Sequence, residues 1–144
     1  MKTIDEIIDF TNQNPVAWVA TSVNGQPHVR AMAMWFADKT GFYFHTGSMK
    51  RLYTQLKGNP RIEAGFIHPG EMQTMQTVRV TGTIEEINDP VLQKKLFEDR
   101  PWLNPLFAAY PNDKIFIFRI AHGEAQYWDM SRNCQEKNIP AIVF

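Results

Sequence analysis

The chain has 144 residues and as many acidic as basic side chains, 15 of each, so its formal net charge is zero. This balance argues against a general nucleic-acid-binding protein, because binding to a phosphate backbone needs an excess of cations. Apolar residues make up 44% of the chain and charged residues 21%, which is typical of a globular protein, and the length fits a single domain over residues 1–144.

The single cysteine, Cys134, has no partner for an intramolecular disulfide, which favours a reducing compartment. No apolar run approaches the roughly 20 residues of a membrane span. Asp5, Glu6 and Asp9 interrupt the apolar residues near the N-terminus, so no signal peptide is expected. The four histidines lack zinc-ligand spacing. We therefore expect a cytoplasmic protein with no membrane association and no structural metal.

The first third of the chain predicts one helix and then three strands joined by tight turns. Thr3 and Glu6 have the spacing of a capping box, and apolar residues then follow helical spacing until Pro15 ends the helix. Asn24-Gly25 lies between two β-rich runs and is typical of a hairpin turn. The expected strands cover residues 16–22, 28–36 and 42–46.

The rest of the chain predicts two more helices among further strands. Gly47-Ser48 is expected to open a short helix with Lys50 and Arg51 in its first turn. A longer helix, capped by Asp89, is expected to about Asp99, before a proline-punctuated segment. The expected strands cover residues 61–67, 76–87, 115–120 and 124–130, the last two around a turn at Gly123. Six or seven short strands with helices only at the periphery predict a mainly β fold, an antiparallel barrel.

Two features favour an anion site. Lys50 and Arg51 oppose the positive end of the helix dipole unless an anion is held there by the free N–H groups, Ser48 and the cations. A solvated helix start with an ordinary surface lysine is the alternative. Arg51 is expected to point toward solvent. Arg30 lies mid-strand among apolar residues and needs an anionic or hydrogen-bonding partner. A structural ion pair would satisfy Arg30 equally well. His28 and His45 are interpreted as ordinary barrel histidines, with a position in the lining of a ligand pocket as the alternative.

The strand expected over residues 28–36 is apolar on both faces. Val29, Ala31 and Ala33 lie on one face, and Met32 and Met34 lie on the other. A barrel interior covers only one of these faces, so the second face needs a partner or a ligand.

Several stretches, in this order, resemble one known family. They are Gly25-Gln26-Pro27-His28-Val29-Arg30, Phe42-Tyr43-Phe44-His45-Thr46, Lys50 to Pro60, Val78-Arg79-Val80-Thr81-Gly82 and Asp89-Pro90. From about Val16 to Trp128 the chain resembles the pyridoxamine 5′-phosphate oxidase-related flavoproteins, in the branch that includes the nitroimidazole-resistance proteins.

The resemblance implies a split barrel and a homodimer with FMN bound at the interface, so that residues 1–144 form one FMN-binding domain. Arg30, Thr46 and Lys50 would contact the phosphate, and Trp128 would approach the flavin from the second subunit. The cofactor-binding residues that the resemblance implies are Arg30, Ala31, Met32, Thr46, Ser48, Lys50, Gln55, Arg79 and Trp128.

The chain departs from the pyridoxamine 5′-phosphate oxidases themselves at two places. Met49 stands where they carry a second basic residue, and residues 139–144 lack their arginine-leucine-X-proline motif. We expect an FMN-dependent oxidoreductase that passes electrons from NAD(P)H to a small acceptor and oxidises pyridoxamine 5′-phosphate poorly. A non-catalytic flavin- or haem-binding protein is the alternative, and an RNA-binding small barrel is disfavoured by the neutral charge.

Overall fold

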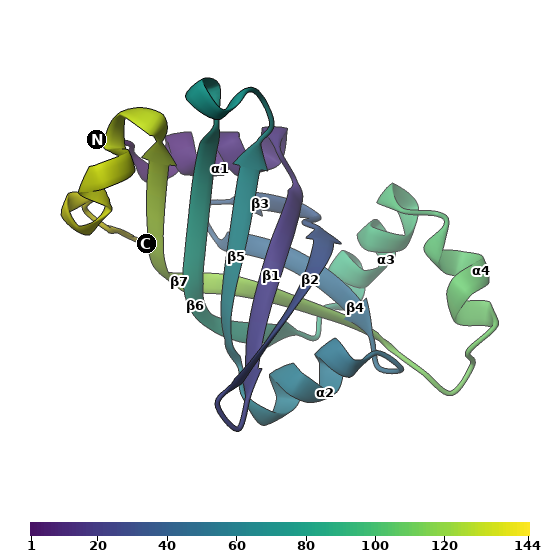
Figure 1. Ribbon diagram of the computed structural model, residues 1–144. Coiled ribbons are helices and arrows are strands. Elements are labelled where there is room, and N and C mark those ends of the chain that lie inside the picture. Colours follow the sequence, from purple (N-terminus) through teal and green to yellow (C-terminus); the bar gives the residue numbers. More distant parts are fainter.

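The computed structural model describes all residues from 1 to 144. They form one antiparallel sheet of eight strands that curls into a barrel, with helices around it (Figure 1). The strand order is β2-β1-β5-β6-β7-β4-β3, and β8 pairs with β7. In chain order the elements are α1 Ile4–Gln13, β1 Val16–Val23, β2 Gln26–Ala33, β3 Phe36–Asp38, β4 Gly41–Gly47, α2 Arg51–Gly58, β5 Arg61–His68, η1 Met72–Thr74, β6 Gln76–Ile87, α3 Pro90–Asp99, α4 Leu103–Ala108, β7 Ile115–Asp129, η2 Met130–Asn138 and β8 Ile142–Val143.

Local sequence patterns decide the first part of the fold. Thr3 accepts a hydrogen bond from the Glu6 backbone at 3.3 Å, while the Glu6 carboxylate accepts one from the Thr3 backbone at 2.8 Å, which completes the capping box. In the β1–β2 hairpin, Asn24 has φ 50° and Gly25 has φ 80°. These values are those of a two-residue type I′ turn, so the predicted helix and hairpin are confirmed.

The two edges of the sheet, β2 and β3, are neighbours in sequence. Only Met34 and Trp35 separate them, and at this point the chain changes its hydrogen-bonding partner from β1 to β4. The Met34 N–H donates to Pro15 O at 2.8 Å, and the Trp35 N–H donates to Tyr43 O at 2.8 Å. The prediction of one return strand over residues 28–36 is therefore wrong, because one straight strand cannot pair with both β1 and β4. We call Met34 and Trp35 the seam of the barrel.

Side chains fill the inside of the barrel. Phe44, Phe66 and Phe118 are fully buried, and the rings of Phe44 and Phe118 stack with centroids 5.6 Å apart. On β6, Val78 and Val80 are buried while Arg79 is exposed, as the alternation predicts. The interior is a packed core, so ligand sites are to be sought at its rim and on its outer face.

The two longest strands, β6 and β7, bend together where Gly82 faces Gly123. A Cβ atom on Gly123 would lie 1.9 Å from the Thr81 carbonyl oxygen, and one on Gly82 would lie 2.5 Å from the His122 carbonyl oxygen. The predicted turn at Gly123 is wrong: the chain continues as one strand, and the glycine permits a close backbone approach.

Other differences from the sequence analysis lie in the second half of the chain. The proline-punctuated segment contains the short helix α4, and η2 and β8 follow β7. The structure has eight strands in place of the expected six or seven. The return strand is split in two, the last two expected strands are joined, and β8 is added. The class of fold, a mainly β split barrel with peripheral helices, is confirmed. None of the helices is both long and apolar enough to cross a bilayer.

Candidate functional site

A cavity of about 370 Å³ lies at the rim of the barrel, and we call it the cation cavity. Residues 28–32 of β2 line one side, His45 and Thr46 of β4 line another, and residues 50–52 with Gln55 close it from α2. Because β2 is one edge of the sheet and β4 lies next to the other edge, the cavity joins the two sides of the seam.

Arg30 is the half-buried cation of this cavity. Its Nη1 donates to Thr21 Oγ1 at 2.9 Å and to Val19 O at 3.3 Å, and its Nη2 donates to Gln55 Oε1. The same Gln55 oxygen also accepts from Thr21 Oγ1 at 2.8 Å. Burial lowers the pKa of Arg30 from its ordinary value, because desolvation penalises the charged form. All of these partners are neutral, so the guanidinium is oriented without being neutralised.

Lys50 and Arg51 lie at the start of α2. The helix begins at Arg51 rather than at Gly47, because Gly47 completes β4 and Lys50 is the N-cap. Lys50 has extended backbone angles and makes no side-chain cap, and the first turn holds no acidic residue. Arg51 is exposed, as expected, yet it also lines the cation cavity. Both cations thus lie beside N–H groups that lack intrahelical partners.

The cation cavity carries an excess of positive charge. None of the ion pairs in the structure involves Arg30, Lys50 or Arg51. No aspartate or glutamate lines the cavity either. In a chain with no net charge, three unpaired cations around one small cavity favour an anionic ligand.

His45 and Arg100 form a second polar group at this cavity. The Arg100 Nη1 lies 2.6 Å from His45 Nε2, and Arg100 also donates to Ala33 O at 3.2 Å and to Met34 O at 2.8 Å. Burial, and then the charges of Arg100 and Lys50, lower the pKa of His45 to about 4. His45 is therefore neutral at pH 7, and its Nε2 accepts the hydrogen bond from Arg100.

Ser48 is turned away from the cation cavity. Its hydroxyl donates to Asp113 Oδ1 at 2.8 Å and accepts from the Lys114 N–H at 2.9 Å. Ser48 therefore holds the turn between β4 and α2, which presents Lys50. Thr46 is nearly buried and lines the cavity.

Arg79 and Trp128 lie in a different hollow, of about 320 Å³, between β6, β7 and η2. Arg79 donates to Gln126 Oε1 at 2.7 Å and to Glu136 Oε1 at 3.0 Å, and Trp128 is paired with Thr77 across the two strands. Within the single chain the structure brings Arg30, Ala31, Met32, Thr46, Lys50 and Gln55 to one cavity and places Arg79 and Trp128 at another.

The outer face of the sheet connects these two hollows. Trp18 on β1 and Val29 on β2 are 58% and 63% exposed, and Val16 and Ile67 extend the same apolar patch. Register pairs Trp18 with Ala31 on one side and with Gly65 on the other, and continues across β5 and β6 toward Arg79. An exposed apolar face of this kind marks an interaction surface.

Comparison with protein families identifies the class of protein to which the chain belongs. Residues 3–129 match the family described as pyridoxamine 5′-phosphate oxidase, and the chain belongs to that family. A curated relative is the pyridoxine/pyridoxamine 5′-phosphate oxidase of Vibrio atlanticus, 29% identical over 144 residues, which cover 98% of this chain and 66% of the relative. The chain thus spans just under two thirds of the length of this curated relative.

Solved structures share the fold. A NimC/NimA family protein from Clostridium acetobutylicum has a TM-score of 0.73 and 17% identity over 97% of this chain and 92% of its own. A heme binding protein from Mycobacterium smegmatis has a TM-score of 0.73 and 13% identity over 99% and 58%. A protein from Mesorhizobium loti described as FAD-binding has a TM-score of 0.62 and 20% identity over 86% and 92%.

The sequence analysis missed the role of Arg100 and undervalued His45. The two residues are 55 positions apart, and no local pattern connects them. An arginine next to Pro101, where α3 ends, gives no indication that its side chain reaches β4.

Proposed function

We propose that this protein is a flavoprotein that holds FMN by its phosphate at the cation cavity and works as an oxidoreductase. The observation that carries the proposal is a small cavity with three cations and no carboxylate to neutralise them. Arg30 gives the most direct support, because a half-buried guanidinium with only neutral partners is stabilised by an added anion. Membership of the pyridoxamine 5′-phosphate oxidase family and the likeness to a FAD-binding protein support a flavin as the ligand.

Each residue of the cavity has a proposed part in holding the cofactor. Arg30, Lys50 and the Thr46 hydroxyl bind the phosphate, and Gln55 positions Arg30 through the hydrogen bond that they share. Ala31 and Met32 flank the flavin ring from the edge of β2. Ser48 acts through the turn that presents Lys50.

The phosphate assignment is tested by thermal melting and by the variant Lys50→Ala. FMN should raise the melting temperature more than riboflavin, because only FMN carries the phosphate. A hydrogen bond to a charged group contributes about 1.5–3 kcal/mol, so Lys50→Ala should weaken FMN binding about 10- to 100-fold.

Lys57→Ala is the matched control, because Lys57 lies on the same helix but pairs with Glu86 at 3.0 Å away from the cavity. Equal stabilisation by FMN and riboflavin, or an equal loss in the two variants, would contradict the assignment.

The proposal includes a homodimer that forms through the outer face of the sheet. The apolar patch around Trp18 and Val29 lies on the same face as Arg79, Gln126 and Trp128. Docking a second copy on this face would bring Arg79 and Trp128 of one protomer toward the cation cavity of the other. Two incomplete hollows would then form one flavin site.

The proposed reaction passes electrons from NAD(P)H to a small acceptor. A bound flavin supplies hydride and single-electron transfer between such partners. Oxidation of pyridoxamine 5′-phosphate needs a second anion site for the substrate. At position 49 the sequence has a methionine in place of a basic residue, and residues 139–144 carry no arginine-leucine-X-proline motif.

Steady-state assays of the FMN-loaded protein test this choice of substrate. NADH or NADPH with a small acceptor should give turnover, while pyridoxamine 5′-phosphate with oxygen should give a kcat/KM several powers of ten lower. A kcat/KM of about 10⁴ M⁻¹s⁻¹ or more with pyridoxamine 5′-phosphate would overturn the proposal.

A non-catalytic binder of haem is the second candidate, favoured by the likeness to the heme binding protein of Mycobacterium smegmatis. The absorption spectrum of the purified protein distinguishes the two candidates, because flavin and haem have different bands. A haem spectrum that persists when FMN is added would favour the second candidate.

A further inference from the structure

Three threonines, Thr11, Thr21 and Thr46, are buried in the structure. Thr46 lines the cation cavity, whereas Thr21 bonds to two of the lining residues without lining the cavity itself. We propose that Thr21 is a positioning residue of the phosphate site, because its hydroxyl sets the direction of both Arg30 and Gln55. The inference rests on the proposed function, which places the phosphate of the flavin at Arg30.

The pairing of β1 with β2 places Thr21 next to the end of the Arg30 side chain. Ala17 and Val19 are buried on the inner face of β1, and Thr21 continues this face with 3% of its surface exposed. Val19 is the cross-strand partner of Arg30. From there the Arg30 side chain reaches along β1, so that its Nη1 lies 2.9 Å from Thr21 Oγ1. A buried hydroxyl costs free energy unless it is hydrogen-bonded, so Thr21 depends on its partners as they depend on it.

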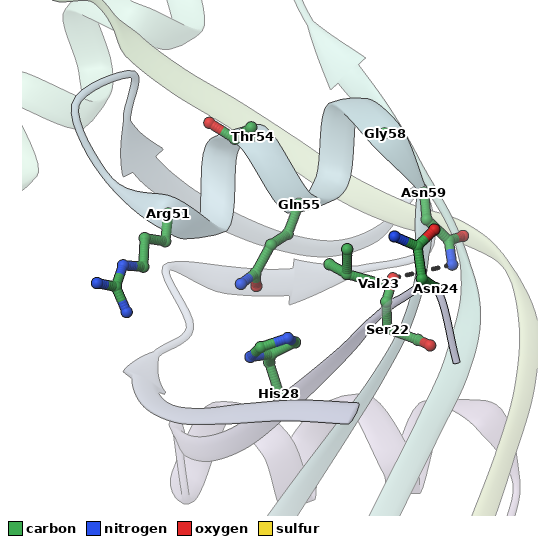
Figure 2. A pocket seen from close by; sticks show the side chains of 9 residues that line it. All are labelled: Ser22, Val23, Asn24, His28, Arg51, Thr54, Gln55, Gly58 and Asn59. Carbon is green, nitrogen blue, oxygen red and sulfur yellow. Dashed lines mark hydrogen bonds between the residues drawn. The ribbon is translucent and has the colours of Figure 1, made fainter. Parts of the chain in front are cut away.

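Gln55 completes a triangle of hydrogen bonds from the side of α2. Figure 2, a view of the hollow beside the cation cavity, shows Gln55 extending from α2 toward the strand that carries His28. Gln55 Oε1 accepts from Thr21 Oγ1 at 2.8 Å and from Arg30 Nη2. Thr21, Arg30 and Gln55 thus bond to one another although they belong to β1, β2 and α2. Each side chain of this triangle restrains the other two.

The donor and the acceptor of each bond in the triangle are determined by its chemistry. Because an arginine side chain can only donate, the Thr21 hydroxyl accepts from Arg30 and gives its single proton to Gln55. Gln55 receives two donors, so it presents its carbonyl oxygen to them. Without the hydroxyl, Gln55 would lose one of these donors. Arg30 Nη1 would keep only the backbone carbonyls of Val19 and His28, at 3.3 and 3.5 Å.

The triangle orients the Arg30 guanidinium without neutralising it. Thr21 and Gln55 carry no charge, and Arg30 Nε takes part in none of the hydrogen bonds that this side chain makes. The Nε–H group and one N–H of Nη2 are therefore left for an anion. A side chain that is already fixed loses less conformational entropy when the anion binds, which favours binding. Thr21 thus supports phosphate affinity through Arg30 and touches no ligand.

The test compares FMN with riboflavin on the flavin-free protein by isothermal titration. Thr21→Val removes the hydroxyl and keeps a side chain of similar size. This variant should weaken FMN binding about 10-fold and leave riboflavin binding within about 3-fold, because only FMN carries the phosphate. Thr21→Ser restores the hydroxyl and should bind FMN within about 3-fold of the wild-type protein. Thr21→Ala, which also lacks the hydroxyl, gives the same comparison if the valine variant does not fold.

A double variant tests whether Thr21 acts through Arg30. In the Arg30→Ala background, Thr21→Val should cause no further loss of FMN affinity, because the group that it orients is absent. Thr11→Val is the matched control. Thr11 is also buried, and its hydroxyl donates to Ile8 O at 3.0 Å within α1, away from the cavity. This variant should keep FMN binding within about 3-fold of the wild-type value.

The outcomes separate the inference from the proposed function. If wild-type protein binds FMN no more tightly than riboflavin, the proposed function fails and the inference fails with it. If the wild-type protein prefers FMN and Thr21→Val keeps that preference, the phosphate site stands and the inference is overturned. Equal weakening of both flavins, an equal effect of Thr11→Val, or additive losses in the double variant would also overturn it.

Discussion

His45 shows how a single residue can depend on the rest of the barrel. It lines the cation cavity, and its ring nitrogen faces Arg100 at 2.6 Å. Burial disfavours the charged form of the ring, and protonation would also add a third positive charge next to Arg100 and Lys50. For these reasons the pKa of His45 falls to about 4 in the folded protein. Its neutral ring keeps Arg100 in place, and Arg100 in turn holds the backbone of Ala33 and Met34.

This arrangement predicts a pH dependence of stability. An unfolded histidine titrates near 6.5, so between about pH 6.5 and 4 the unfolded state binds a proton that the folded state does not. The contribution of His45 is therefore fully present above about pH 6.5 and is lost as the pH falls toward 4. Denaturant unfolding at several pH values should show this loss of stability. In His45→Gln the pH dependence between about pH 6.5 and 4 should be weaker, by the slope that corresponds to the uptake of about one proton on unfolding. An unchanged slope in the variant would contradict the assignment.

At the scale of single residues, the sequence predicted the cations that local patterns expose. Lys50 was found because it lies at the start of a helix, and Arg30 because it interrupts an apolar strand. Arg100 and the hydrogen bond between Gln55 and Arg30 depend on tertiary contacts 55 and 25 positions apart, so no local pattern indicates them. The orientation of Ser48 depends likewise on Asp113 and Lys114.

At the scale of elements, the Gly82–Gly123 crossing fixes the bend of the two longest strands. A side chain at Gly123 would collide with the Thr81 backbone, which cannot move without breaking the β6–β7 pairing. Gly123→Ala should therefore destabilise the protein by about 2 kcal/mol or more. Chemical denaturation measures the loss.

Gly58→Ala is the control for this prediction. Gly58 ends α2, and a Cβ atom there meets nothing within 4 Å. Because alanine favours helix by about 0.5–1 kcal/mol over glycine, this variant should be neutral or slightly more stable. Similar losses in both variants would mean that the crossing does not constrain the fold.

The elements that the sequence predicted correctly are those that begin or end at capping or turn residues. The capping box at Thr3, the Asn24-Gly25 turn and the Asp89-Pro90 helix start all lie where their residue types require. The errors at the seam and at Gly123 concern which strand pairs with which. Which strands pair is decided by contacts between residues far apart in the sequence, so a local pattern of about ten residues does not indicate the pairing.

At the scale of the whole molecule, the exposed apolar face predicts the assembly. Trp18→Glu places a charge in this patch and should convert the proposed dimer to a monomer in light scattering at micromolar concentration. Val91→Glu is the control, because Val91 is an apolar residue on α3 that is even more exposed than Trp18 and does not belong to the patch. A wild-type protein that is monomeric with FMN bound would refute the proposed interface.

The seam of the barrel is the place where the sheet is not closed by backbone pairing. The strands β2 and β3 do not pair with each other, and the chain passes between these two edges of the sheet through Met34 and Trp35, where Arg100 donates to Ala33 O and Met34 O. Because no ladder of backbone hydrogen bonds joins β2 to β3, we expect the barrel to open here more readily than between β5, β6 and β7, which are paired along their length. The cation cavity spans this opening, with Arg30 on one edge and Thr46 on the other side. A phosphate bound by both residues would thus close the barrel, and breathing of the seam would set how fast the ligand enters and leaves.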